Sequence, residues 1–185
     1  MLPRSSRSTV KSTLHGITRK VLDGDVTVQV WQSGMEDTLS AAHLSAYAIG
    51  AGMKLRDLTD KDHSVVQSLL KIQFDHLKDY SNALRDGQYK GTPESALHRS
   101  QMYADATKAS WWMGKTRGLV LPAWPCDGST QCLTNCDCSW EVRQLEGDGN
   151  WDATWKLGAN DNCQTCAERA AEWAPYRIRG GDVQL

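Results

Sequence analysis

Apolar residues recur at steps of three and four along much of the first 118 residues, and this spacing predicts amphipathic helices. The first helix is expected from about Asp25 to Gly50, ended by the glycines of Gly50-Ala51-Gly52. Val26, Val28 and Val30 also alternate as in a short strand, but the helical register covers more residues and we adopt it. The apolar stripe of this helix consists of Val28, Trp31, Met35, Leu39, Ala42, Ala46 and Ile49.

Two further helices are expected before Gly118. One opens at Thr59, with Asp62 three residues later in a capping-box arrangement, and runs to about Asp86. The other is announced by Thr92-Pro93-Glu94, which supplies an N-cap, a proline at the first helical position and an acid in the first turn. Three helices joined by short loops predict a small bundle.

After Gly118 the spacing of the apolar residues changes from every third or fourth residue, typical of a helix, to every second residue, typical of a strand. Trp140 and Val142 alternate with polar residues, as do Trp151 and Trp155, and residues 146–150 between them are rich in turn formers. This pattern predicts a β-hairpin. A short helix is expected from Ala167 to Trp173.

Cysteines are confined to this last region. Six occur from Cys126 onward and none earlier, in a C-x3-C-x-C group before the hairpin and a C-x2-C group after it. The antiparallel hairpin should bring the two groups together, and zinc takes four such ligands tetrahedrally. We therefore predict a structural Zn²⁺ ion as the cofactor. Its candidate ligands are Cys132, Cys136, Cys138, Cys163 and Cys166.

Spacing leaves two ligand sets open. Either Cys132 and Cys136, or Cys136 and Cys138, would join the Cys163–Cys166 pair, and Cys126 is expected to be a spectator. Disulfides or free core thiols in a mature particle are the alternative to a metal. The predicted fold class is therefore α+β: an N-terminal helical bundle followed by a small zinc-stabilised β-hairpin module and a short C-terminal helix.

Catalytic chemistry is not indicated, and we expect no enzyme and no catalytic residue. The five histidines all lie outside the cysteine region, whereas catalytic zinc sites usually include histidine or carboxylate ligands. Phosphate-binding, dinucleotide-binding and nucleophile-elbow motifs are absent from the sequence, and so is the H-E-x-x-H motif. A redox C-x-x-C would follow a strand in a βαβ setting, which is not predicted here.

Charge and composition add four expectations. The formal net charge is −1, which gives no global footprint for nucleic acid or an anionic membrane. Residues 1–20 are basic and free of acids, and we interpret them as a flexible arm, with nucleic-acid contact as the alternative. Residues 21–118 would be the helical domain and 119–185 the cysteine-rich and tryptophan-rich module. We expect neither a membrane span nor a secretory signal, and therefore synthesis in a reducing cytoplasm.

Tryptophan is the other unusual feature, with eight residues against one phenylalanine. Large flat side chains would supply the core of a module that has few residues. Trp111 and Trp112 point about 100° apart on a helix, so we expect one in the helical core and the other against the module. Five of the eight lie in the cysteine-rich third: Trp124, Trp140, Trp151, Trp155 and Trp173.

Several segments together resemble tailed-phage minor head proteins, the head-morphogenesis family that includes the F protein of phage Mu. The segments are residues 99–106, Leu121 to Pro125, Asp127 to Glu141 with its N-C-x-C element, Trp155 to Gly158, and the Cys163–Cys166 pair. The order of N-C-x-C before C-x-x-C differs from the family's common order, and Cys132 stands in effect where the family has a histidine. The resemblance covers roughly residues 20–176 and implies a virion protein near the portal, with portal and capsid proteins as partners and no small-molecule substrate.

Two other function classes remain open at this point. Zinc, tryptophan and the basic N-terminus are compatible with a nucleic-acid-binding module. A C-x-C followed by C-x-x-C also occurs in redox-switched chaperones, in which thiol oxidation releases the metal.

Overall fold

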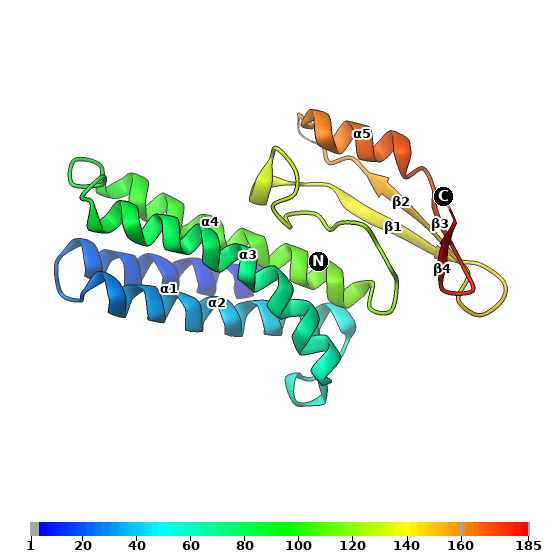
Figure 1. Ribbon diagram of the computed structural model, residues 1–185, viewed down its shortest axis with the longest axis horizontal. Helices are drawn as coiled ribbons and strands as arrows, with labels where there is room; N and C mark the ends of the chain where they lie inside the picture. The colour runs from blue at the N-terminus through cyan, green and yellow to red at the C-terminus, as the bar shows by residue number, and fades with distance from the viewer. Residues whose placement is uncertain (1–3, 160, 185) are drawn as a thin grey trace.

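The computed structural model describes residues 4–159 and 161–184, with helices at one end of the molecule and a sheet at the other (Figure 1). This arrangement confirms the predicted α+β class, with helices first and the sheet second. The long helices are α1 (Arg4–Leu22), α2 (Val28–Ala51), α3 (Asp60–Arg85) and α4 (Pro93–Lys115). A short 3-10 turn, η1 (Leu55–Asp57), lies between α2 and α3, and a second, η2 (Leu133–Asn135), follows α4.

Side-chain caps begin α2 and α3. The Thr27 hydroxyl accepts a hydrogen bond from the Val30 amide at 3.2 Å, which places the start of α2 at Val28 and excludes the alternative strand. Thr59 and Asp62 form the predicted capping box, confirming the start of α3. Asp62 also accepts hydrogen bonds from Tyr47 (2.7 Å) and Arg117 (2.6 Å), so this carboxylate joins α3 to α2 and to the chain after α4.

The N-terminal segment is a helix in the bundle, so the prediction of a flexible arm over residues 1–20 was wrong for the described residues 4–20. Val10, Leu14, Ile17 and Val21 form an apolar stripe that packs into the helical core, and Leu14 is fully buried. The basic residues lie around this stripe, where Lys11 pairs with Asp105 at 2.8 Å. Residues 1–3 lie outside the described part of the chain.

Helices α2 and α4 cross at two glycines. A methyl group at Gly50 would overlap the carbonyl oxygen of Trp111, and one at Gly114 would overlap that of Tyr47. Gly50 therefore permits close packing inside α2, and the helix ends instead at Gly52, whose φ of 66° is left-handed.

The core of the bundle combines aliphatic side chains with polar side chains that have buried partners. Trp31 packs edge-on against Tyr80 with ring centroids 4.9 Å apart, and its indole donates to the Thr18 hydroxyl at 3.1 Å. His43 is fully buried, with its Nδ1 at 2.8 Å from the Ser110 hydroxyl. Burial lowers the pKa of His43 from 6.5 to about 4, because the charged imidazolium loses its hydration there.

The sheet is antiparallel and has the order β1-β2-β3-β4. The predicted hairpin is confirmed: β1 (Ser139–Gln144) pairs with β2 (Trp151–Lys156), and Trp140 faces Trp155 across it. Strands β3 (Tyr176–Arg179) and β4 (Asp182–Gln184) extend the sheet and were not predicted. Helix α5 (Gln164–Glu172) follows β2 and is the predicted short C-terminal helix, although it begins three residues earlier than expected.

A second core lies between the sheet, α5 and α4. Trp140, Trp155 and Trp173 pack together with centroid distances of 5.2 to 5.7 Å. Trp111 and Trp112 of α4 both contact this second core, whereas we had expected one of them in the helical core. Helix α4 thus packs against both the helical bundle and the module.

Candidate metal centre

The predicted cysteine groups meet at one end of the hairpin. Ser139 pairs with Lys156, so the segment that enters β1 and the segment that leaves β2 lie side by side. Cys132, Cys136 and Cys138 lie on the entering segment, with η2 between the first two. Cys163 is the N-cap of α5, and Cys166 lies in its first turn.

All five predicted cysteines belong to one thiol cluster, which we define as Cys132, Cys136, Cys138, Cys163 and Cys166. It contains two groups whose sulfur atoms lie within 4.8 Å of one another: Cys132 with Cys163 and Cys166, and Cys136 with Cys138 and Cys166. Cys166 belongs to both groups and is therefore the centre of the cluster.

The sulfur spacing suits a tetrahedral metal ion. The distances are 3.6 Å from Cys163 to Cys132, 3.7 Å from Cys132 to Cys166 and 3.8 Å from Cys136 to Cys166. A tetrahedron with metal–sulfur bonds of about 2.3 Å has edges of about 3.8 Å. The thiol cluster therefore has the donor chemistry and the spacing to hold a metal ion.

Cys126 lies outside both groups. It is buried at a positive φ of 68°, and its thiol lies 3.1 Å from each of the carbonyl oxygens of Thr134 and Cys136. This arrangement agrees with its expected place outside the ligand set. Both predicted four-cysteine sets contain Cys136 and Cys163, which lie in different groups of three, so which four cysteines would bind a metal stays a prediction.

The thiols of the cluster differ in acidity. Burial raises the pKa of Cys136 to about 12 and raises that of Cys166 further. Partial burial tends to raise the pKa of Cys163. Hydrogen bonds from the backbone of Cys166 and Cys132 and from their thiols outweigh this effect and lower the pKa to about 7. A metal ion must therefore displace protons from the deeper cysteines, while Cys163 is already partly thiolate at neutral pH.

Groups outside the cysteines hold the cluster in place. Lys108 of α4 donates to the Cys136 carbonyl at 2.6 Å and ties the entering segment to the bundle. Arg169 of α5 donates to the Ser129 hydroxyl at 3.0 Å and lies over the Trp173 ring at 5.2 Å from its centroid. Asn162, whose side-chain oxygen is 3.7 Å from the Cys138 sulfur, was not anticipated, because a lone asparagine carries no metal-binding spacing.

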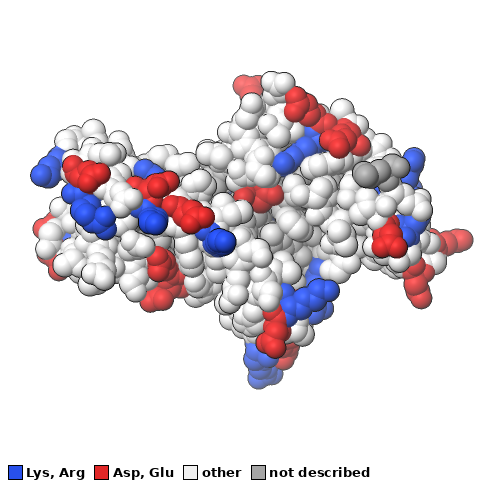
Figure 2. Space-filling view, in the orientation of Figure 1, with Lys and Arg blue, Asp and Glu red and all other residues white. Residues whose placement is uncertain are grey.

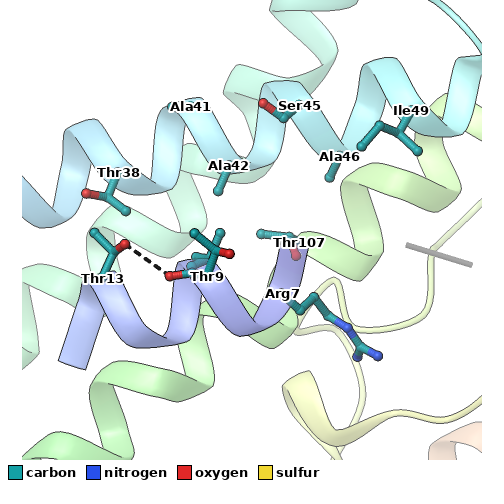
Figure 3. Close-up of a pocket in the computed structure, with 11 residues that line it drawn as sticks. Arg7, Thr9, Thr13, Thr38, Ala41, Ala42, Ser45, Ala46, Ile49 and Thr107 are labelled. Carbon is teal, nitrogen blue, oxygen red and sulfur yellow. Dashed lines mark hydrogen bonds between the residues drawn. The ribbon is translucent and has the colours of Figure 1, made fainter. Parts of the chain in front are cut away.

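None of the described histidines joins the metal-ligand groups. A groove lies between α1 and α2 (Figure 3). Small and hydroxyl-bearing side chains such as Thr9, Thr13, Ala42 and Ser45 line it. Its one charged residue, Arg7, lies 3.9 Å from the carboxylate of Asp105.

The surface charge is mixed. On the face shown in Figure 2, acidic and basic side chains are interspersed over both the helices and the module, and they form no continuous basic track on that face. Within the described ranges, no helix combines the length and the apolar character that crossing a membrane requires.

Comparison of the chain with models of known families, with curated proteins and with solved structures found no match.

Proposed function

We propose that this chain is a non-enzymatic structural or assembly protein of a tailed-phage particle, in which the thiol cluster holds one structural Zn²⁺ ion. The observation that carries the metal proposal is the convergence of five cysteines at spacings close to the edges of a zinc–thiolate tetrahedron. A metal there would join the segment before β1 to α5, in a module whose sheet alone has short strands.

The phage assignment rests on the resemblance of the cysteine-rich segments to minor head proteins. Those segments form the entry to β1, the end of β2 and the start of α5, so the resemblance follows one folded unit. In this proposal the bundle and the module form an interaction surface for portal and capsid proteins, and the protein resides in the virion after synthesis in the bacterial cytoplasm.

Two measurements test the proposal separately. Elemental analysis of protein purified without added metal should find about one zinc per chain, and a metal-free, fully folded protein would refute the metal site. Mass spectrometry of purified particles from a phage that encodes the chain should detect it at low copy number. Two results together would refute the structural role: absence of the chain from wild-type particles, and normal particle assembly when its gene is deleted.

A thiol redox sensor is the second candidate, because the cluster has five thiols and one tetrahedral ion takes four. The lowered pKa of Cys163 would favour its oxidation. Mild peroxide should then release zinc and form a reversible disulfide in intact protein. Retention of zinc until the protein unfolds would exclude this candidate and leave the structural one.

A further inference from the structure

A small pocket lies where α3 and α4 meet the η2 turn of the module. Its volume is about 160 Å³, well below the roughly 300–1,000 Å³ of pockets for drug-sized ligands. Gln73 and His76 of α3, Arg99 and Tyr103 of α4, and Leu133 and Thr134 of η2 contribute to its wall. Both structural units therefore form the pocket.

Gln73 is the least expected residue in this wall. The residue is only 3% exposed, and no described residue is hydrogen-bonded to its carboxamide, yet the amide atoms are not among the enclosed side-chain atoms that lack a partner. The small exposed part of Gln73 therefore includes its amide, which lies in the pocket wall with its hydrogen-bonding capacity unused by the described protein. A ligand in the pocket could use that donor and that acceptor.

Arg99 supplies a positive charge beside this amide. Its guanidinium donates to the Tyr89 hydroxyl at 2.9 Å and lies over the Tyr80 ring, 4.6 Å from the centroid. No acidic side chain among the described residues lies within ion-pair distance of it. The neighbouring tyrosines hold the guanidinium in position while its charge remains available to an anion.

The rest of the pocket wall is partly apolar. Met102 contributes from α4, and Leu133 contributes from η2, where it is 46% exposed and has a positive φ of 50°. A branched residue in the left-handed region is strained, and such strain is concentrated at binding sites. The backbone at Leu133 thus places an apolar side chain at the pocket against the local conformational preference.

We propose that this pocket binds the carboxylate of a short apolar acid, with Arg99 and Gln73 holding the carboxylate and Met102 and Leu133 contacting the apolar group. Arginine and amide donors match a planar carboxylate, and a single guanidinium suits a single negative charge. The same chemistry is offered by a free short-chain acid and by the C-terminal leucine of a peptide.

The test is titration calorimetry on the full-length protein as purified. The first probe is 4-methylpentanoate, and its amide, 4-methylpentanamide, is the matched control that keeps the shape and removes the charge. The second probe is a pentapeptide ending in leucine, with a free or an amidated C-terminus. We expect at least one carboxylate probe to bind about tenfold or more tightly than its amide. Equal affinity for both members of both pairs would overturn the proposal.

Three variants separate binding from folding. Arg99→Gln should weaken carboxylate binding about tenfold or more, and Lys78→Gln, which removes an exposed positive charge of α3 outside the pocket, should not change it. Gln73→Leu should weaken binding several-fold without lowering the thermal midpoint, because the substitution removes no hydrogen bond within the described protein and keeps an apolar side chain in the α3 core position. A Gln73→Leu protein that binds normally, or one that unfolds more easily with unchanged binding, would assign Gln73 a structural role and contradict the proposal.

Discussion

The helical bundle and the cysteine-rich module solve the problem of stability in different ways. The bundle buries a continuous apolar core over four long helices and brings α2 and α4 into backbone contact at Gly50 and Gly114. The module has short strands, and it combines tryptophan packing on one side of the sheet with the thiol cluster at one end. The comparison indicates that the two units should respond to different perturbations.

The largest expected effect tests the proposed metal site of the module. If a metal is bound there, Cys166→Ser should remove roughly 10 kcal/mol of metal-dependent folding free energy and unfold the module, because Cys166 belongs to both sulfur groups. Tryptophan fluorescence should report this, while far-UV circular dichroism retains the helical signal. Cys126→Ser is the matched control and should keep both signals. A Cys166→Ser protein with native fluorescence and no zinc would show that the module does not need a metal, and one with full zinc content would show that Cys166 is not a required ligand.

The second effect is confined to the bundle. Gly50→Ala places a methyl group against the Trp111 carbonyl of a packed backbone, so we expect a loss of about 4 kcal/mol in the free energy of unfolding. Gly16→Ala in α1, where nothing lies within 4 Å, should be neutral or stabilising by up to about 1 kcal/mol. Urea titration followed by circular dichroism compares the two. Similar midpoints for both variants would contradict the close crossing.

The third effect is a pH dependence that belongs to the bundle. The pKa of His43 is lowered to about 4, so between about pH 6.5 and pH 4 the unfolded chain takes up a proton that the folded chain does not. The stability contributed by neutral His43 is present above pH 6.5, and about 3 kcal/mol should be lost as the pH falls to 4. Urea midpoints across this range should show a shallower pH slope in His43→Gln. An unchanged slope would mean that His43 is not the group responsible.

The smallest effect concerns the joint between the two units. Lys108→Met removes the hydrogen bond from α4 to the Cys136 carbonyl, and we expect the unfolding free energy of the module to fall by about 1 kcal/mol. The exposed Lys61 provides the control, since Lys61→Met should change neither transition. Fluorescence-detected and circular-dichroism-detected melting curves separate module from bundle. An equal shift in both curves would show that the units unfold together.

Much of this organisation could be predicted from the sequence because its signals are local. The Thr59–Asp62 capping box and the alternation around Trp140 and Trp155 depend on neighbours within a few residues, and both were confirmed. The convergence of the cysteines could be predicted because the local alternation indicates a hairpin. A hairpin brings the segment before its first strand next to the segment after its second strand. That the ion is Zn²⁺ stays a prediction.

The features that were missed depend on tertiary contacts. The apolar residues of α1 are few and widely spaced, so its basic residues suggested a solvated arm. The acidic partner of Lys11 is Asp105 of α4, which lies far away in the sequence. The strands β3 and β4 have four and three residues, too few for an alternation to be distinguished from a loop. Gly50 resembled a helix terminator, because the partner backbone at Trp111 that requires a glycine lies far away in the sequence.

The turn between β1 and β2 has a practical consequence for labelling the protein. It lies at the opposite end of the hairpin from the thiol cluster, about 20 Å away along six residues of strand. Gly149 and Asn150 are tied to the β3–β4 turn, whereas Asp148 is exposed. A peptide tag inserted beside Asp148 would therefore allow purification or imaging of the protein while leaving every cysteine untouched.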